Sequence, residues 1–287
     1  MRGVERHGKR RHRLRALGGM LILLLLLAPP PTRAAFVRLT PLWSDTESID
    51  ATKLRPFLER GVLALIESNP DRSLKQITLI AHVAAPPEEV FRHTVDLEKY
   101  PEFLRNVVKA KVEEREKNGF SYRYEIEVPL SNMEGKNHVV VRPPHHADFQ
   151  AISGDIETGR WHWEFQRTKE NETIVLFSNY SDIREIGWIM RKIVATEPLI
   201  EHGIDVGANY IHLRAIKNRA EGKPPFKGKT LPRRKDAPIS LRPFPHLSDP
   251  KLRPLLNRLL DRGMVALIEE FPDGALKQIS ICERVAV

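Results

Sequence analysis

Few side chains in this sequence have the types and spacing that catalysis requires. His145 and His146 lie beside two prolines, with no cysteine or third histidine at ligand spacing, so they predict a surface turn and no metal site. The only cysteine, Cys282, lies near the end of the sequence and does not fit the nucleophile of a Cys/His site. No Gly-x-Ser-x-Gly motif, which would mark a serine nucleophile, is present.

Residues 222–230 end like a phosphate-binding loop but depart from that motif in three ways. Five residues separate the two glycines instead of four, two of the five are prolines, and the segment follows a predicted helix where the motif follows a strand. We therefore expect no bound nucleotide and no other cofactor.

Acid–base chemistry would have to come from isolated residues on the predicted strands. His138, Arg142, Asp182 and Glu125 are the candidates for an acid, a base or an oxyanion partner. No two of them stand out as a pair by spacing. An enzyme of the cyclase or dehydratase type is therefore the alternative hypothesis, and we assign no catalytic residue.

Apolar residues alternate with polar ones along two predicted strands, which places them on one face of a sheet. The first strand carries Tyr122, Tyr124, Ile126 and Val128, and the second carries Trp161, Trp163 and Phe165. Such faces form either an ordinary core or the wall of a ligand cavity.

The order of predicted elements indicates an α+β fold. A strand over 74–84 precedes two short helices, and strands follow near 107–116, 120–129, 137–142, 147–153, 160–168 and 172–182. A long helix over about 197–219 closes the unit. Apolar and small residues form one stripe on this helix, which predicts that it faces the sheet: Ile200, Gly203, Ile204, Gly207 and Ile211.

Three segments resemble the START-like (SRPBCC) superfamily, in particular its polyketide cyclase and coenzyme Q-binding branch. They are residues 85–91 (APPEEVF), 96–104 (DLEKYPEFL) and 159–165 (GRWHWEF). The resemblance covers about residues 74–218 and implies a helix-grip fold, in which an antiparallel sheet wraps around a long C-terminal helix. Two predicted features depart from this branch: a secretion signal over residues 1–34 and a helix over about 51–68, before the first strand.

The resemblance also implies a cavity between the sheet and the long helix. A sterol, quinone, polyketide or acyl ligand would suit its aromatic walls. The leading hypothesis is a noncatalytic carrier of such an apolar molecule, and a protein-interaction module with a filled core is a further alternative. The expected ligand-binding residues are Tyr100, Phe103 and Leu104 at the mouth, Tyr122, Tyr124, Trp161, Trp163 and Phe165 on the sheet, and the five stripe residues of the helix.

An internal repeat joins the two ends of the sequence. Residues 60–84 match residues 262–286 at 14 of 25 positions, more than chance produces. We expect a helix over about 51–68 at the start of the first copy, and only a helix plus one strand in the second, residues 247–287. Such a tail docks on the first domain, stays partly disordered or begins a second, truncated domain. We favour truncation, and expect the tail to share little buried area with the first domain.

The positive charge is concentrated in two segments. Residues 1–34 carry net +7 of the formal +9, and residues 217–236 carry net +6, which leaves the rest neutral to acidic. This distribution argues against nucleic acid as a partner. The second cluster lies in a linker rich in proline and basic residues, predicted over 219–246, and would allow peripheral contact with a membrane.

Residues 1–34 have the three parts of a secretion signal. A basic segment precedes an apolar core over residues 16–28, and Thr32 and Ala34 supply small residues before a cleavage site. The core is shorter than the roughly 20 residues that span a bilayer, which favours cleavage over an anchor. The sequence therefore predicts export, to the periplasm or outside the cell, of a START-like domain over 51–218.

Overall fold

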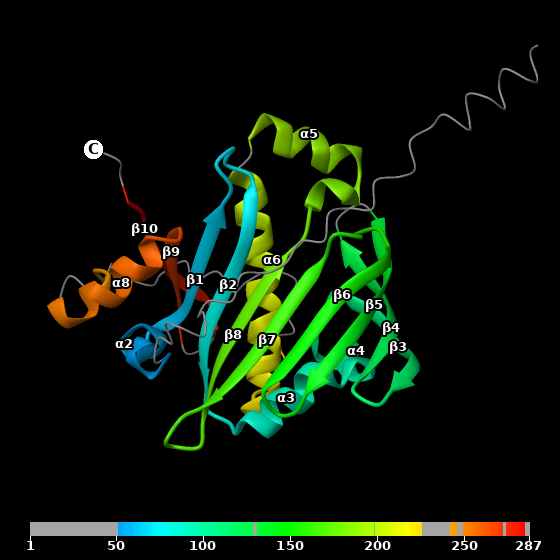
Figure 1. The fold of residues 1–287 in the computed structure, drawn as a ribbon, viewed down its shortest axis with the longest axis horizontal. Coiled ribbons are helices and arrows are strands. Elements are labelled where there is room, and N and C mark those ends of the chain that lie inside the picture. The colour runs from blue at the N-terminus through cyan, green and yellow to red at the C-terminus, as the bar shows by residue number, and fades with distance from the viewer. Residues whose placement is uncertain are drawn as a thin grey trace, which may run out of the picture. The chain divides into compact units, whose positions relative to one another are not determined.

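One antiparallel sheet of ten strands organises the residues that this computed structural model describes, which are 51–128, 131–197, 199–225, 242–245, 249–271 and 274–284. The strands lie in the order β10-β9-β1-β2-β8-β7-β6-β5-β4-β3 (Figure 1). Their bounds are β1 Gly61–Ser68, β2 Leu74–Val83, β3 Val107–Glu116, β4 Gly119–Val128, β5 Ser131–Arg142, β6 His146–Gly154, β7 Arg160–Arg167, β8 Thr173–Tyr180, β9 Met264–Glu270 and β10 Leu276–Cys282.

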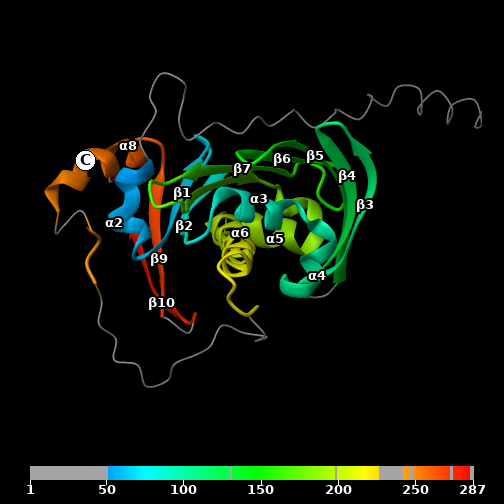
Figure 2. The same cartoon turned by 90° about the horizontal axis from the view of Figure 1, so that it is seen from below.

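Helices lie on both sides of this sheet. Figure 2 shows the part of the sheet from β2 through β8, β7, β6, β5 and β4 to β3 curving around the long helix α6, with α3, α4 and α5 on the same side as α6. Helices α2 and α8 lie at the end of the sheet that holds β1 and β9. The helix bounds are α2 Arg55–Leu58, α3 Pro87–Val95, α4 Tyr100–Phe103, α5 Trp188–Thr196, α6 Leu199–Ala220 and α8 Arg253–Leu260. Short 3-10 turns are η1 Ala51–Leu54, η2 Leu97–Lys99, η3 Ile183–Ile186 and η4 Pro250–Leu252.

Two apolar clusters fill the two faces of the sheet. The larger lies on the concave face and includes Trp163, Phe165 and Phe177 together with Leu213 of α6. The smaller lies on the other face under α2 and α8, and joins Leu63 and Leu65 of β1 to Val265 and Leu267 of β9, among others. Each cluster draws on alternate residues of the strands, as the two-residue period of a strand requires.

The helix-grip fold predicted from the sequence is confirmed. The strand predicted over 74–84 is β2, the six later strands are β3 to β8, and the predicted closing helix is α6. Burial alternates along β6 and β7, whereas β2 and β8 are buried along most of their length on both faces.

The helix expected over 51–68 is wrong beyond residue 58, because residues 61–68 form β1. Val62 to Ile66 are all apolar and all buried, so this strand is covered on both faces. A continuous apolar run carries no alternation, and periodicity alone does not separate it from a buried helix.

The C-terminal tail also differs from the prediction. It forms a helix and two strands where one strand was expected, and β9 pairs with β1 from Gly61↔Glu269 to Ile66↔Met264. Val265 and Leu267 are completely buried in the smaller cluster. The tail thus docks on the first domain, and the expectation that it shares little buried area is wrong.

Other predictions fall wholly or partly outside the described residues. The secretion signal over 1–34 lies outside them, as do residues 226–241 and 246 of the predicted linker. Its described part includes Phe244, which is buried and packs against Phe57 of α2 with ring centroids 5.6 Å apart. No helix among the described residues is long and apolar enough to cross a membrane.

Candidate functional site

A cavity of about 260 Å³ lies between the concave face of the sheet and α6. Its rim includes the exposed Asn106 and the exposed face of α6 at Ile204 and Ala208. The wall is mostly aromatic and aliphatic, and its members are Tyr100, Leu104, Val107, Ala110, Tyr122, Tyr124, Ile126, Val128, Met133, Phe149, Ile156, Trp161, Trp163, Ile183 and Ile186. A wall of this kind suits an apolar ligand.

Strands β4 and β7 supply most of the aromatic wall. Tyr122 and Tyr124 lie on the inner face of β4 with ring centroids 6.0 Å apart. Trp163 of β7 stacks on Phe177 of β8 at 3.8 Å, which fixes the Trp163 ring against the sheet. The alternation of the two strands thus places Tyr122, Tyr124, Trp161 and Trp163 at the cavity.

The structure brings seven of the predicted ligand-binding residues to the cavity wall: Tyr100, Leu104, Tyr122, Tyr124, Trp161, Trp163 and Ile204. Phe103 and Phe165 lie in the packed core instead. Phe103 packs edge-on against Tyr100, and Phe165 lies between Phe91 and Trp163. They support the wall from behind and do not line it.

The stripe predicted on the closing helix does not face the sheet. Ile200, Ile204 and Ile211 are 39%, 38% and 53% exposed, and the space where a side chain would start at Gly203 or Gly207 is open within 4 Å. Of this stripe only Ile204 reaches the cavity, at its rim.

A different face of α6 is buried, and much of it is polar: Glu201, His202, Asp205, Asn209, Tyr210, Leu213, Arg214 and Ile216. A hydrophobic pattern cannot identify a polar buried face, which is why the sequence reasoning missed it. The signal that could have found it was an acid and an amide at i and i+4, Asp205 and Asn209, in the helix that closes the cavity.

Asp205 forms the polar end of the cavity. Its side chain is 3% exposed, and Ser181 Oγ donates a hydrogen bond to its Oδ1 at 3.0 Å. Its Oδ2 is buried and has no hydrogen-bond partner among the described atoms. Burial raises the pKa of Asp205 to about 7, and the nearby carboxylates of Glu201 and Asp182 act in the same direction. The acid is therefore poised to donate or to accept a hydrogen bond near neutral pH.

His212 lies two turns further along α6, also at the cavity wall. The rings of Tyr100 and Trp163 meet it edge-on at 5.4 and 5.3 Å. Removal from water lowers the pKa of His212 to about 4, so the imidazole is neutral at pH 7. The cavity thus holds an uncharged histidine opposite the aromatic sheet.

A second polar group lies on β5. Asn137 donates from Nδ2 to the Tyr122 hydroxyl at 2.9 Å, and its Oδ1 is buried without a partner among the described atoms. Both residues line the cavity. A bound molecule with a hydroxyl or amide donor would satisfy this acceptor.

The four residues considered for catalysis do not line the cavity. Glu125 accepts from Asn132 Nδ2 at 2.6 Å, Arg142 pairs with Asp148 at 3.2 Å, and Asp182 holds Arg184 by two hydrogen bonds. His138 lies on β5 between the inward-facing Asn137 and Val139, on the opposite face. The alternation that turns Tyr124 and Ile126 toward the cavity already turns Glu125 away from it.

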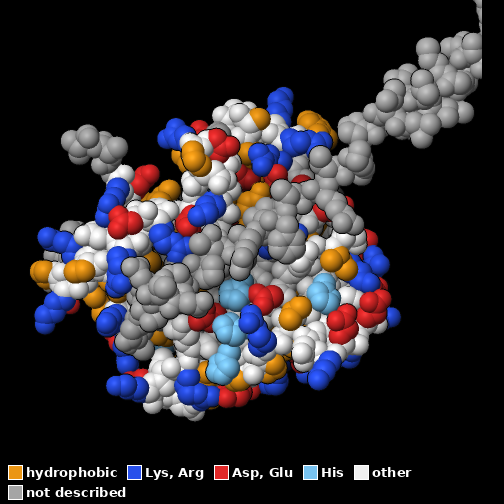
Figure 3. All heavy atoms as spheres, in the orientation of Figure 1, with side chains coloured by type: hydrophobic (Ala, Val, Ile, Leu, Met, Phe, Trp, Pro, Cys, Tyr) orange, Lys and Arg blue, Asp and Glu red, His pale blue; other side chains and the backbone are white. Residues whose placement is uncertain are grey.

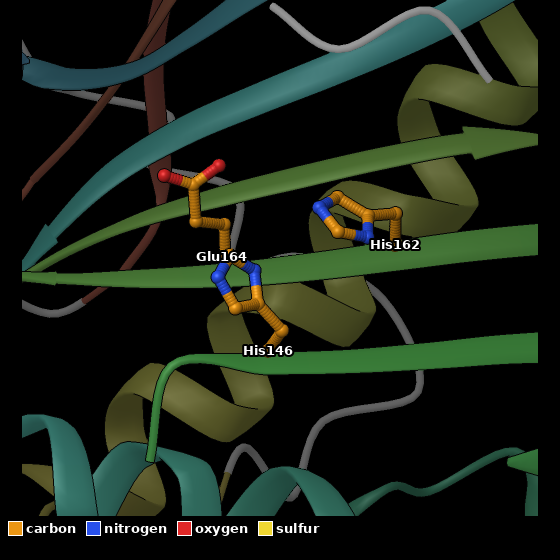
Figure 4. Close-up of side chains that lie close together, drawn as sticks. All are labelled: His146, His162 and Glu164. Atoms are coloured by element: carbon orange, nitrogen blue, oxygen red, sulfur yellow. The ribbon is translucent and has the colours of Figure 1, made fainter. Parts of the chain in front are cut away.

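The outer face of the sheet carries a separate polar group. Histidine and acidic side chains gather near the middle of this face (Figure 3). Within it, His146 of β6 and His162 and Glu164 of β7 lie close together, with one nitrogen or oxygen atom of each within 4.8 Å of the others (Figure 4). The surface turn predicted for the two histidines holds for His145, whereas His146 is the first residue of β6.

Residues 83–196 match a family model described as polyketide cyclase / dehydrase and lipid transport. These residues run from the end of β2 to the end of α5 and include the strands that form most of the cavity wall. The chain carries a START-like domain of the SRPBCC superfamily. The family and the fold suggest a START domain that binds a lipid or polyketide or that is of the cyclase type.

Several solved structures are similar to this START-like domain. The Zhui aromatase/cyclase from a Streptomyces species is 12% identical, covers 51% of this chain and 93% of its own, and has a TM-score of 0.42. A fragment of a STAR-related lipid transfer protein from Xanthomonas axonopodis is 10% identical, covers 56% and 93%, and scores 0.44. A START superfamily protein from Mycobacterium smegmatis is 15% identical, covers 51% and 97%, and scores 0.38. No curated protein matches the sequence.

The basic cluster at 217–236 is only partly described. Lys217 and Lys223 both pair with Glu221, and Arg219 pairs with Glu102 at 3.0 Å. The described basic side chains of this segment are therefore engaged either with Glu221 of the same segment or with Glu102 of the START-like domain.

Proposed function

We propose that the START-like domain is a noncatalytic carrier of an apolar small molecule or lipid that has an oxygen-bearing group at one end. The observation that supports this proposal most directly is the position of Asp205. It puts an unpartnered acid oxygen at one end of a cavity whose wall is mostly aromatic and aliphatic. A buried polar atom without a partner costs about 1–3 kcal/mol, and a ligand carbonyl or hydroxyl at this point would remove that cost.

The ligand class follows from the wall and its two polar points. Tyrosine and tryptophan rings favour flat or extended apolar molecules, and Asp205 and Asn137 each offer one hydrogen-bonding atom. A sterol, a quinone, a polyketide or an acyl chain with a polar head would each meet these requirements. A plain hydrocarbon would leave both polar atoms unpaired.

The test uses the purified full chain, extracted with organic solvent and analysed by mass spectrometry. In parallel, a fluorescent fatty acid, a fluorescent sterol and a short-chain ubiquinone are titrated into the extracted protein. We expect a retained molecule or binding of at least one probe.

Ala208→Trp places a large ring at the rim and should block uptake, whereas Ala195→Trp, on the exposed surface of α5 away from the cavity, should not. Equal uptake by the two variants would place the ligand elsewhere.

A cyclase-type enzyme is the second candidate, and one observation favours it. A carboxyl group whose pKa lies near 7 inside an apolar cavity has the property that a general acid needs. In this alternative, Asp205 protonates a ligand carbonyl while the walls fold the chain of the substrate. Loss of turnover in Asp205→Asn with probe binding retained would support the enzyme. Unchanged chemistry of the bound molecule in wild type and variant would support the carrier.

We also propose that the domain is exported and that residues 1–34 are removed. The support is the three-part pattern of the segment in the sequence. Intact-mass measurement of the protein from its native host is expected to give a chain that begins near Ala35. A mass that includes Met1 would overturn the proposal of cleavage.

A further inference from the structure

Three potential ligand side chains share the outer face of the β6–β7 pair. His146 lies directly opposite Glu164 in the antiparallel register, and His162 precedes Glu164 by two residues on the same strand. The residues between them point the other way, because Ala147 and Trp163 are buried on the concave side. The two-residue period of a strand thus puts both histidines and the carboxylate on one surface. Figure 4 shows the three side chains in front of the two strands.

Neighbouring side chains hold two of the three in place. His162 Nδ1 lies 2.5 Å from Asp148 Oδ1, which leaves the other ring nitrogen of His162 available. Asp148 is itself fixed by Arg142 at 3.2 Å. Glu164 accepts a hydrogen bond from Gln166 Nε2 at 2.6 Å. A carboxylate behind a histidine is the arrangement that orients the imidazole in many metal sites.

His146 supplies an independent indication that a partner is missing. Its Nδ1 is buried and has no hydrogen-bond partner among the described atoms. The ring lies nearly parallel to that of His162, with centroids 5.8 Å apart. Buried ring nitrogens are normally bonded, so an unpartnered one beside another histidine and a carboxylate indicates an external ligand.

We propose that His146, His162 and Glu164 form a binding site for a divalent transition metal of the zinc class on the outer face of β6 and β7. Two imidazoles and one carboxylate suit Zn²⁺ and its neighbours, while Mg²⁺ and Ca²⁺ prefer oxygen ligands alone. Ligand atoms within 4.8 Å of one another can converge to bonds of about 2.0–2.2 Å by small side-chain rotations. Three protein ligands leave a further position open to water.

This site is separate from the cavity, which lies on the opposite face of the same strands. The proposal therefore stands or falls independently of the carrier function. Asp148 acts as a positioning residue, since it contacts His162 and is not one of the three ligands.

The test titrates the metal alone into the full chain with Cys282→Ser as background, because a free thiol is itself a metal ligand. Co²⁺ gives a visible absorption band when bound in a low-coordinate site, and competition by Zn²⁺ gives the affinity. We expect one ion per chain at this site. His162→Gln or His146→Gln should weaken Zn²⁺ binding at least tenfold, and Asp148→Asn by about ten- to a hundredfold.

His145→Gln is the matched control, because His145 is exposed beside His146 but lies outside the cluster. It should change the affinity less than twofold. Glu164→Gln guards against misfolding of the histidine variants, since it keeps the shape of the side chain and removes only the charge. Equal affinity in His145→Gln, His146→Gln and His162→Gln would overturn the proposal. The same holds if Glu164→Gln binds Co²⁺ as tightly as the background protein does.

Discussion

Ala64 of β1 lies directly opposite Ala266 of β9. Ala266 is also the residue that corresponds to Ala64 in the second copy of the repeat. The neighbouring pairs are equally symmetric, because Leu63 meets Leu267 and Leu65 meets Val265. The two copies of the repeat thus pair with each other around an approximate two-fold axis at the two alanines. The edge of β1 in the first copy is therefore complementary to the edge of β9, the equivalent strand of the second copy.

The ion pairs obey the same symmetry. Arg60 binds Glu269 through two hydrogen bonds at 2.8 and 3.1 Å, and Arg262 binds Glu67 through two at 3.0 and 3.3 Å. Both glutamates are almost completely buried. Each repeat therefore offers an arginine to the glutamate of the other at the two ends of the β1–β9 pair.

Removing the charge of Glu67 should loosen the tail. Glu67→Gln leaves Arg262 without its carboxylate in a partly buried place, and we expect the free energy of unfolding to fall by roughly 1–3 kcal/mol. Glu59→Gln is the control, because Glu59 forms an exposed pair with Arg55 and should cost at most about 1 kcal/mol. Urea denaturation measures both. Equal effects of the two changes would show that the buried pair adds nothing beyond a surface pair.

Gly263 is required by the close approach of β1 and β9. A Cβ atom there would lie 2.2 Å from the carbonyl oxygen of Ile66, and one at Gly61 would lie 2.0 Å from that of Ile268. Gly263→Ala should therefore push the strands apart and destabilise the protein by about 1–3 kcal/mol. Increased hydrogen exchange confined to β1, β9 and β10 would locate the change. A variant as stable as wild type would contradict the pairing.

Alanine at the glycines of α6 should have the opposite effect. Gly203 and Gly207 have helical surroundings and open space, so Gly203→Ala and Gly207→Ala should each stabilise by up to about 1 kcal/mol. Thermal melting measures this, and ligand retention should not change. A loss of stability on Gly207→Ala would mean that its face of α6 is covered.

The sequence predicted those features in which one polar face and one apolar face alternate. Tyr122 and Tyr124, or Trp161 and Trp163, were placed correctly because the residues between them are polar. The strand β1 was missed because residues 62–66 form a continuous apolar run, which is equally compatible with a buried helix. Asp205 was missed because hydrophobic periodicity treats a buried acid as a surface residue. The histidine cluster was missed because His146 meets His162 and Glu164 only through strand pairing.

The ionisation of Asp205 should be visible in the dependence of stability on pH. The folded protein holds the pKa of Asp205 at about 7, above the usual 3.8 that the unfolded chain restores. Well below pH 3.8 the group is protonated in both states and has no effect on the difference. As the pH rises from 4 to 7, the unfolded chain ionises first, so the folded state loses stability relative to it. Above pH 7 both states are ionised and the loss is complete.

Asp205→Asn removes this titration while keeping the shape of the side chain and an oxygen that accepts the hydrogen bond from Ser181. The variant should be close to wild type in stability at pH 4 and more stable at pH 8, by roughly 4 kcal/mol if the whole pKa difference is expressed. The difference between the two proteins isolates Asp205, because Glu201, Asp182 and the other titrating groups are present in both. Urea denaturation at half-unit steps of pH gives this difference curve. If the curve is flat from pH 4 to pH 8, Asp205 is ionised in the folded protein, and the argument that it donates to a ligand carbonyl fails.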